Sequence, residues 1–234
     1  MNSERFIDVK LAREGMGAFV LRSGIHASLK RSIREFRGRV LDVGCGCMPY
    51  REVIKSSKAV TGYVGLDIEG ASVYDASVVP DYRWDGWVMP FGDGEFDTAM
   101  ATEVLEHCPD PGVCVRETAR VLRPGSALFV TVPFVHPVHE SPHDYQRFTA
   151  YGLKRLLLAN GFGSCEIGAH GGPHAAMAHM IGLFASAVRI AEWKRKMITL
   201  LAIPAMRYLL AKDRTCDPFA ERALFPGLYA VARK

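Results

Sequence analysis

The stretch Val40-Leu41-Asp42-Val43-Gly44-Cys45-Gly46 decides the fold, because an apolar run leads directly into a turn that holds two glycines. The apolar run predicts a short buried strand from Arg39 to Val43. Glycine lets the backbone of such a turn approach a ligand closely, because it has no Cβ atom. A helix predicted from Tyr50 to Ser56 would aim its free N–H groups at the same ligand. We therefore expect a ligand-binding turn at the end of this strand.

A second acidic residue follows the turn at a distance typical of nucleotide-binding folds. A strand is predicted from Val60 to Leu66, and Asp67 stands at its end. An acid at this place, about twenty residues after the glycines, can accept hydrogen bonds from ribose hydroxyls. The third glycine of a dinucleotide-binding turn is missing, and Pro49 holds its place. This difference counts against a nicotinamide-dependent oxidoreductase, which we keep as a less favoured alternative.

Strand and helix patterns alternate along the rest of the chain. Further strands are predicted over residues 96–101, 127–132, 165–169 and 228–232, and helices over 113–122 and 151–159. Such alternation favours an α/β fold. We expect a Rossmann-like, doubly wound and mostly parallel sheet with helices on both faces.

Two segments fall outside this alternation. Apolar residues recur at helical spacing before the first strand, where a helix either packs on the sheet as a cap or acts as a lid over a substrate pocket. A second apolar stretch precedes the last strand. We therefore expect an N-terminal helical cap (1–38), a ligand-binding core (39–170), an apolar helical insertion (171–222) and the last strand of the core (223–234).

Several motifs in this order resemble those of the class I S-adenosylmethionine-dependent methyltransferases, in particular the small-molecule, type 11-like family. Asp42-Val43-Gly44-Cys45-Gly46 is similar to the family's Asp/Glu-x-Gly-x-Gly, and Gly65-Leu66-Asp67-Ile68 to its acidic end of strand two. Residues 85–97 resemble its Asp-Ala-x-x-Leu-Pro-Phe stretch, with Gly86 in place of alanine. Thr102-Glu103-Val104-Leu105-Glu106-His107 and Arg120–Gly125 resemble the segments after strand four and before strand five.

The resemblance implies S-adenosylmethionine as the cofactor. It implies that Gly44–Gly46 pass beneath the methionine part, that Asp67 holds the ribose diol and that Asp85 accepts from the adenine amino group. The cofactor-binding residues that we expect on this basis are Asp42, Gly44, Cys45, Gly46, Asp67, Ile68, Asp85, Gly86, Thr102, Glu103 and His107.

A histidine-rich loop, residues 133–149, follows the strand predicted at 127–132. His139-Glu140-Ser141-Pro142-His143 formally matches the zinc-protease motif, but Pro142 breaks the helix that this motif requires. A non-helical metal site from His136, His139 and His143 and a plain proline-braced loop are alternatives, and we expect no metal. Some bacterial class I methyltransferases among surface-polysaccharide and glycolipid genes carry a similar run, which implies that the loop closes over the methyl acceptor.

Catalytic residues are expected in this loop. If the acceptor is a hydroxyl, its proton must leave, and a histidine is the natural base at neutral pH. His139 is the first choice for this base, followed by His143. Arg147 is expected to clamp an acidic group of the substrate by bidentate hydrogen bonds, and Asp144 or Glu140 to orient a histidine.

Residues 175–211 are rich in apolar side chains, and Pro204 and several charges interrupt them. Helices here either pack on the sheet, form the face of a homodimer, or lie at a membrane surface with Trp193 and the basic residues 194–196 as anchors between two arms. Each arm is too short for a comfortable membrane span.

Composition restricts the partners. The chain has 29 basic and 25 acidic residues, a net charge of +4, without the dense basic stripe of a nucleic-acid-binding protein. The six cysteines form no regular framework and the start lacks a secretory core, so we expect a cytoplasmic protein, peripheral at the membrane if the apolar helices lie there. The expected function is methyl transfer to a small-molecule, glycan or lipid-linked acceptor, at oxygen; a non-catalytic cofactor-binding or membrane-adaptor protein is the alternative.

Overall fold

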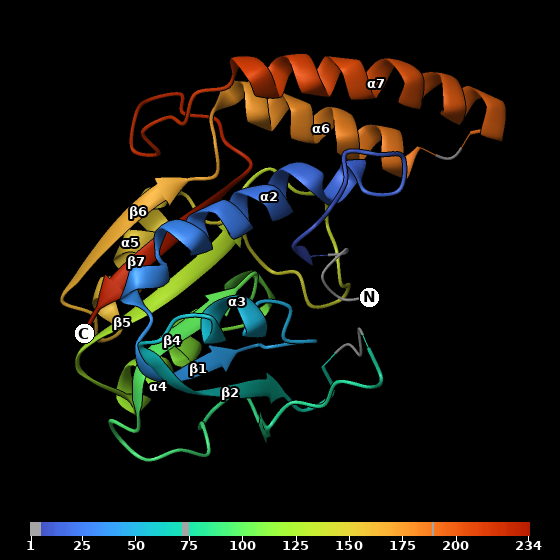
Figure 1. Ribbon diagram of the computed structural model, residues 1–234. Coiled ribbons are helices and arrows are strands. Elements are labelled where there is room, and N and C mark those ends of the chain that lie inside the picture. The colour runs from blue at the N-terminus through green and yellow to red at the C-terminus, as the bar shows by residue number, and fades with distance from the viewer. Residues whose placement is uncertain (1–5, 72–74, 189) are drawn as a thin grey trace.

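The computed structural model describes residues 6–71, 75–188 and 190–234. In this part of the chain, seven strands form one sheet in the order β3-β2-β1-β4-β5-β7-β6 (Figure 1). The strands are β1 (Gly38–Val43), β2 (Val60–Ile68), β3 (Tyr82–Trp84), β4 (Phe96–Thr102), β5 (Leu122–Pro133), β6 (Ser164–Ala169) and β7 (Gly227–Arg233). Strands β1 to β5 run parallel, and only β7 is antiparallel to its neighbours β5 and β6. The expected doubly wound, mostly parallel sheet is thereby confirmed.

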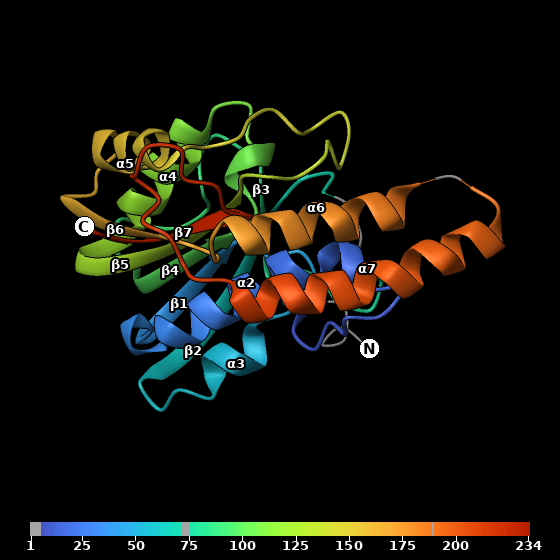
Figure 2. The ribbon, with the colours of Figure 1, turned by 90° about the horizontal axis from the view of Figure 1, so that it is seen from above.

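Helices cover both faces of this sheet, as Figure 2 shows from above. Alternate residues of a strand point to opposite faces. Leu41 of β1 belongs to the core beneath α4 (Pro111–Val121) and α5 (Ala150–Ala159). Its neighbour Val40 belongs to the core beneath α2 (Met16–Arg31) and α3 (Arg51–Lys55). Strands buried on both faces explain why the predicted strands appear as continuous apolar runs.

The local sequence explains where several elements begin. The side chain of Asp110 accepts the N–H of Gly112 at 2.8 Å and caps α4, which has Pro111 at its first position. Thr149 caps α5 in the same way. Strand β3 was not expected, because three residues in a polar stretch carry no readable period.

The apolar segment before the last strand folds into two helices, α6 (Pro173–Ala187) and α7 (Glu192–Lys212). They pack against each other, and α6 packs against α2. The cluster between them includes Met16 and Val20 of α2, Ala178 of α6 and Met206 of α7. Trp193 and its basic neighbours lie in the first turns of α7, not between two arms as expected, and Pro204 lies inside the helix. Among the described residues, no helix has both the length and the apolar character to cross a membrane.

Candidate active site

The glycine turn lies at the carboxyl end of β1, at the centre of the sheet. Gly44 and Gly46 have φ values of +64° and +49°, a region that glycine enters without strain. A Cβ atom on Gly44 would lie 2.5 Å from Cγ2 of Val104. The N–H of Gly46 donates to Oδ2 of Asp67 at 3.0 Å, and this bond joins the turn to the end of β2. The turn and the acid identified in the sequence are thus parts of one site.

A cavity of about 540 Å³ opens beside this turn, along the carboxyl ends of β1, β2 and β4. Open α/β sheets bind ligands at this edge. Eight of the predicted cofactor residues line it: Gly44, Gly46, Asp67, Ile68, Asp85, Gly86, Glu103 and His107. Cys45 and Thr102 line an adjoining cavity instead.

Asp42 lies in neither cavity. Its carboxylate is buried within the sheet and accepts a hydrogen bond from the hydroxyl of Tyr63. Burial raises the pKa of Asp42 to about 7. The carboxylate of Asp42 therefore contacts Tyr63 inside the fold, and its expected contact with the cofactor stays a prediction.

Two carboxylates of the larger cavity differ in environment. Asp67 is buried, which raises its pKa, and it also accepts the N–H of Ile68 at 2.8 Å. Asp85 is exposed, and its Oδ1 accepts the N–H groups of Trp87 and Val88 at 2.8 and 3.0 Å, which lower its pKa. Two backbone N–H groups therefore hold the Asp85 carboxylate in place as an anion at the cavity, and Gly86 beside it has φ +88°.

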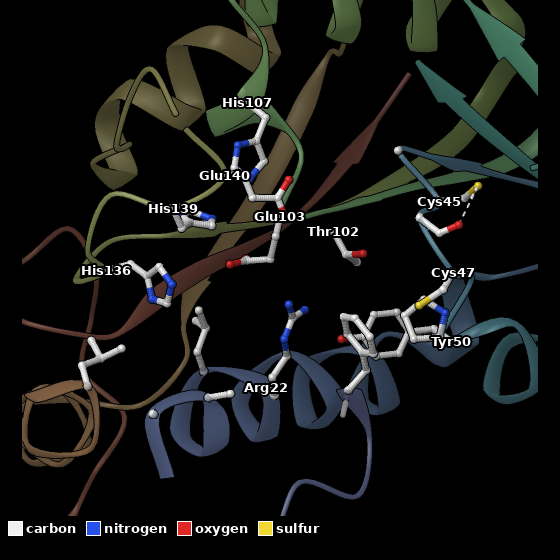
Figure 3. Close-up of a pocket in the computed structure, with 18 residues that line it drawn as sticks. Arg22, Cys45, Cys47, Tyr50, Thr102, Glu103, His107, His136, His139 and Glu140 are labelled. Carbon is white, nitrogen blue, oxygen red and sulfur yellow. Dashed lines mark hydrogen bonds between the residues drawn. The ribbon is translucent and has the colours of Figure 1, made fainter. Parts of the chain in front are cut away.

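The adjoining cavity has a volume of about 260 Å³ and lies between the glycine turn, α2 and the histidine-rich loop (Figure 3). His136, His139 and Glu140 of the loop line it, as does Leu183 of α6. The two cavities share five lining residues: Gly44, Gly46, Glu103, His107 and Glu140. A ligand in one cavity therefore meets a ligand in the other at these residues.

His107 stands at this junction with a defined tautomer. Its Nδ1 lies 2.7 Å from the carbonyl oxygen of His143, which can only accept, so Nδ1 carries the proton and Nε2 keeps its lone pair. Burial lowers the pKa of His107. The ring is thus neutral near pH 7 and is held by the histidine-rich loop.

Asp144 positions His139. Its Oδ2 accepts the backbone N–H of His139 at 3.0 Å and lies 3.2 Å from Nδ1 of the same residue. Desolvation, followed by the nearby His107, lowers the pKa of His139. The structure therefore gives Asp144 the orienting role that the sequence left open between Asp144 and Glu140.

Arg147 lines neither cavity, which speaks against its expected role as a substrate clamp. Its guanidinium makes the bidentate pair with Asp144, at 2.5 and 2.8 Å, and donates to the carbonyl of Pro137 at 3.1 Å. This pairing holds the pKa of Asp144 well below its usual range. A bidentate pair was expected for Arg147, but its partner is Asp144, three residues earlier in the same loop.

The three loop histidines separate in the structure. His136 and His139 line the smaller cavity, with ring centroids 4.8 Å apart. His143 is exposed, lines the larger cavity, and has Nδ1 3.1 Å from the hydroxyl of Tyr145. Burial lowers the pKa of His136 to about 3, and the nearby His139 adds to this effect. His143 is therefore less well placed than His139 for work in the smaller cavity.

Sequence reasoning missed Arg22. It lies on α2 and points toward Glu103 across the smaller cavity (Figure 3). Glu103 accepts a hydrogen bond from the Thr131 hydroxyl at 3.0 Å, and desolvation raises its pKa to about 7. No motif marks Arg22, because only the packing of α2 over the turn brings it to the cavity.

The strand order with an antiparallel β7, the glycine turn and the acid at the end of β2 are features of the class I S-adenosylmethionine-dependent methyltransferase fold. The chain has the fold of this class. Residues 41–130 match the family described as a methyltransferase domain.

The chain is similar to proteins of this class from distant organisms. It is 41% identical over 101 residues to cycloartenol-C-24-methyltransferase 1 of Oryza sativa subsp. japonica, covering 39% of this chain and 29% of that one. It is 36% identical over 104 residues to ubiquinone biosynthesis O-methyltransferase of Xanthomonas oryzae pv. oryzae, covering 40% of this chain and 42% of that one. The match thus spans less than half the length of these relatives. A solved S-adenosylmethionine-dependent methyltransferase from Archaeoglobus fulgidus has the same fold, with a TM-score of 0.53, 18% identity, and coverage of 90% of this chain and 93% of that one.

Proposed function

We propose that this protein transfers a methyl group from S-adenosylmethionine to a hydroxyl of a small-molecule or glycan-like acceptor. The observation that carries the proposal is the pair of cavities that meet at Gly44, Gly46, Glu103, His107 and Glu140. The larger cavity fits the cofactor, because its turn is a cradle that a Cβ atom on Gly44 would obstruct, and Asp67 and Asp85 offer acceptors for ribose and adenine. The smaller cavity fits the acceptor.

The bound cofactor supplies an electrophilic methyl group on a sulfonium, so the protein contributes mainly alignment and exclusion of water. Helix α2, the glycine turn and the histidine-rich loop enclose the smaller cavity and perform that task. Arg22 favours an acceptor that carries a negative group, such as a phosphate or a carboxylate. The similarity to an O-methyltransferase favours oxygen as the methylated atom.

The acceptor hydroxyl must lose its proton, and we assign His139 to this step. A neutral imidazole can take up a proton directly, or hold a metal ion that acidifies the hydroxyl. Both roles need the unprotonated ring, and the lowered pKa of His139 provides it at neutral pH. Asp144 keeps the ring in place through the contacts described above.

The test is methyl transfer from labelled S-adenosylmethionine to a panel of hydroxylated sugars, sugar phosphates and polyphenols. With the acceptor found, we expect His139→Gln to lower kcat by about 10²- to 10⁴-fold. Its affinity for S-adenosylhomocysteine should stay within about twofold, because His139 does not line the larger cavity. The control is His174→Gln, an exposed histidine on α6. Equal turnover by both variants would remove His139 from the reaction.

We also infer a peripheral contact with membranes. Five large side chains of α7 are 52 to 70% exposed, namely Trp193, Met197, Leu200, Leu201 and Tyr208. Their spacing places them on one face of the helix, opposite the buried Ala202 and Met206. Lys194, Lys196, Arg207 and Lys212 flank this apolar stripe. An exposed apolar stripe between basic residues is typical of a helix that lies in the interface of an anionic membrane, and it favours a lipid-linked acceptor and a location at the cytoplasmic surface.

A further inference from the structure

Glu106 is a buried carboxylate that the function described so far does not use. Its residue is 0% exposed, and neither carboxylate oxygen has a hydrogen-bond partner among the described residues. A buried ionised group without a partner is costly, so a proton or a cation has to neutralise it. The histidines around it show which cation the site suits.

His107 faces this carboxylate with a free lone pair. Its Nε2 lies 3.7 Å from Oε1 of Glu106, while its Nδ1–H donates to the carbonyl oxygen of His143. An imidazole whose far N–H is held by a carbonyl is the usual arrangement of a metal-ligating histidine, because that bond fixes the tautomer and the ring orientation. The hydrogen bond to His143 therefore prepares Nε2 as a ligand.

His139 completes the group from the other side. The ring centroids of His107 and His139 are 4.7 Å apart, and one ligand atom each from Glu106, His107 and His139 lies within 4.8 Å of the others. Asp144 lies beside His139, as carboxylates do beside ligating imidazoles. Three ligands, one carboxylate and two imidazoles, thus converge at the edge of the smaller cavity, and two further contacts support the imidazoles.

We propose that Glu106, His107 and His139 hold a divalent transition-metal ion, with Zn²⁺, Fe²⁺ and Mn²⁺ as the fitting class. Two imidazoles and one carboxylate are a common ligand set for such ions, and three protein ligands leave coordination positions open. Since His107 and His139 line the smaller cavity, those positions face the acceptor. Arg147, the cation of the same loop, hydrogen-bonds Asp144 and acts on Glu106 only through its charge, so the carboxylate oxygens of Glu106 stay open to a ligand.

This inference rests on the proposed methyl transfer and says how its acceptor is activated. The acceptor oxygen binds the metal ion, which stabilises the alkoxide and so lowers the pKa of the hydroxyl. The proton leaves the oxygen for the carboxylate of Glu103, which lines both cavities. The oxygen then forms the bond to the methyl carbon as the bond from that carbon to sulfur breaks. His139 thereby serves the reaction as a ligand.

The experiment is a titration of the chelator-treated full chain with Co²⁺, followed by the visible absorption of the bound ion. We expect one saturable Co²⁺ per chain, with Zn²⁺ competing for it. Glu106→Gln and His139→Asn should each weaken Co²⁺ binding by about tenfold or more, since even residues that only support ligands change affinity by 10- to 100-fold. Glu52→Gln and His174→Asn, at exposed positions, are the matched controls and should bind as the wild type does.

Binding of S-adenosylhomocysteine is measured on the same samples and separates the two proposals. If the cofactor product binds but neither Co²⁺ nor Zn²⁺ does, Glu106 is neutralised by a proton and the metal site is wrong, while the proposed function stands. If S-adenosylhomocysteine does not bind to the folded wild type, the proposed function itself fails. Equal Co²⁺ affinity in all variants would show binding elsewhere and would overturn the site. If Glu106→Gln does not fold by circular dichroism, His139→Asn, in a loop, decides the result.

Discussion

Gly44 shows how a single residue determines both the fold of a loop and the access of a ligand. Its positive φ and the 2.5 Å approach to Val104 leave no room for a side chain. Val104 lies three residues before the junction residue His107. A Cβ atom at Gly44 would therefore displace the turn and the segment after β4 together.

We predict that Gly44→Ala weakens S-adenosylhomocysteine binding by about tenfold or more, because positive φ and the clash with Val104 cost of order 1–3 kcal/mol in the binding-competent turn. The matched control is Gly62→Ala in β2, where the nearest atom to a new Cβ lies at 3.6 Å. Isothermal titration of both variants gives the comparison. Equal affinities would show that the turn does not approach the cofactor.

His170 is 4% exposed, and burial lowers its pKa to about 3, compared with 6.5 for an ordinary histidine. Between these values only the unfolded chain binds the proton, so His170 lowers the free energy of unfolding as the pH falls below 6.5, by about 1.4 kcal/mol per pH unit. We predict that His170→Phe removes about 2 kcal/mol of the loss between pH 7 and pH 5. Denaturant titrations at both pH values test this, with the exposed His174→Phe as control. The prediction fails if the two variants lose the same free energy.

At the scale of elements, the histidine-rich loop is built around one internal ion pair. The side chain of Asp144 is 2% exposed and binds both Arg147 and the backbone of His139. Arg147 in turn holds the carbonyl of Pro137. A loop without helix or strand thus keeps His136 and His139 at fixed places because its charges are satisfied within it.

The exposed apolar stripe of α7 is the second element whose role can be tested. We predict that the chain sediments with vesicles of phosphatidylcholine and phosphatidylserine, more at low salt than at high salt, since basic residues flank the apolar stripe. Leu201→Ser should lower the partition coefficient by about tenfold, because burial of a leucine is worth about 1.5–3 kcal/mol. Leu158→Ser, an exposed leucine on α5, is the matched control.

Two results would contradict the proposed membrane contact of α7. No sedimentation at either salt concentration would remove the membrane contact. A dimer in gel filtration that Leu201→Ser converts to a monomer would assign the apolar stripe to a second copy of the chain instead.

At the scale of the whole molecule, the smaller cavity exists because distant segments close over one sheet edge. Its walls come from α2, the glycine turn, the histidine-rich loop and α6. Helix α6 packs on both α2 and α7, so the apolar insertion braces the helix that carries Arg22 (Figures 1 and 2). The N-terminal helix is thus both part of the core and a wall of the site.

We predict that S-adenosylhomocysteine at 100 times its dissociation constant raises Tm by about 5 to 10 °C. A ligand at that concentration stabilises the folded state by about 2.7 kcal/mol, and a chain of this size gains about 2–4 °C per kcal/mol. NAD and NADH should leave Tm unchanged, because the turn lacks the third glycine of a dinucleotide site. A shift with the nicotinamides alone would assign the chain to the oxidoreductases.

The sequence by itself determined the class of fold and the glycine turn and acids of the larger cavity. The sequence signals there are local: apolar runs predict the strands, Gly44 and Gly46 predict the turn, and Asp67 stands at the end of β2. Because parallel strands place their carboxyl ends at one edge, these local signals meet in space without further contacts.

Only the tertiary structure decided what the smaller cavity contains. Arg22 reaches it from α2, His107 meets His139 beside a buried Glu106, and Arg147 turns to Asp144. The loop histidines are alike in sequence, and no period distinguishes His139 from His143. Their separation follows from loop packing and from charges satisfied within the fold, and such contacts between residues far apart in the chain leave no local pattern.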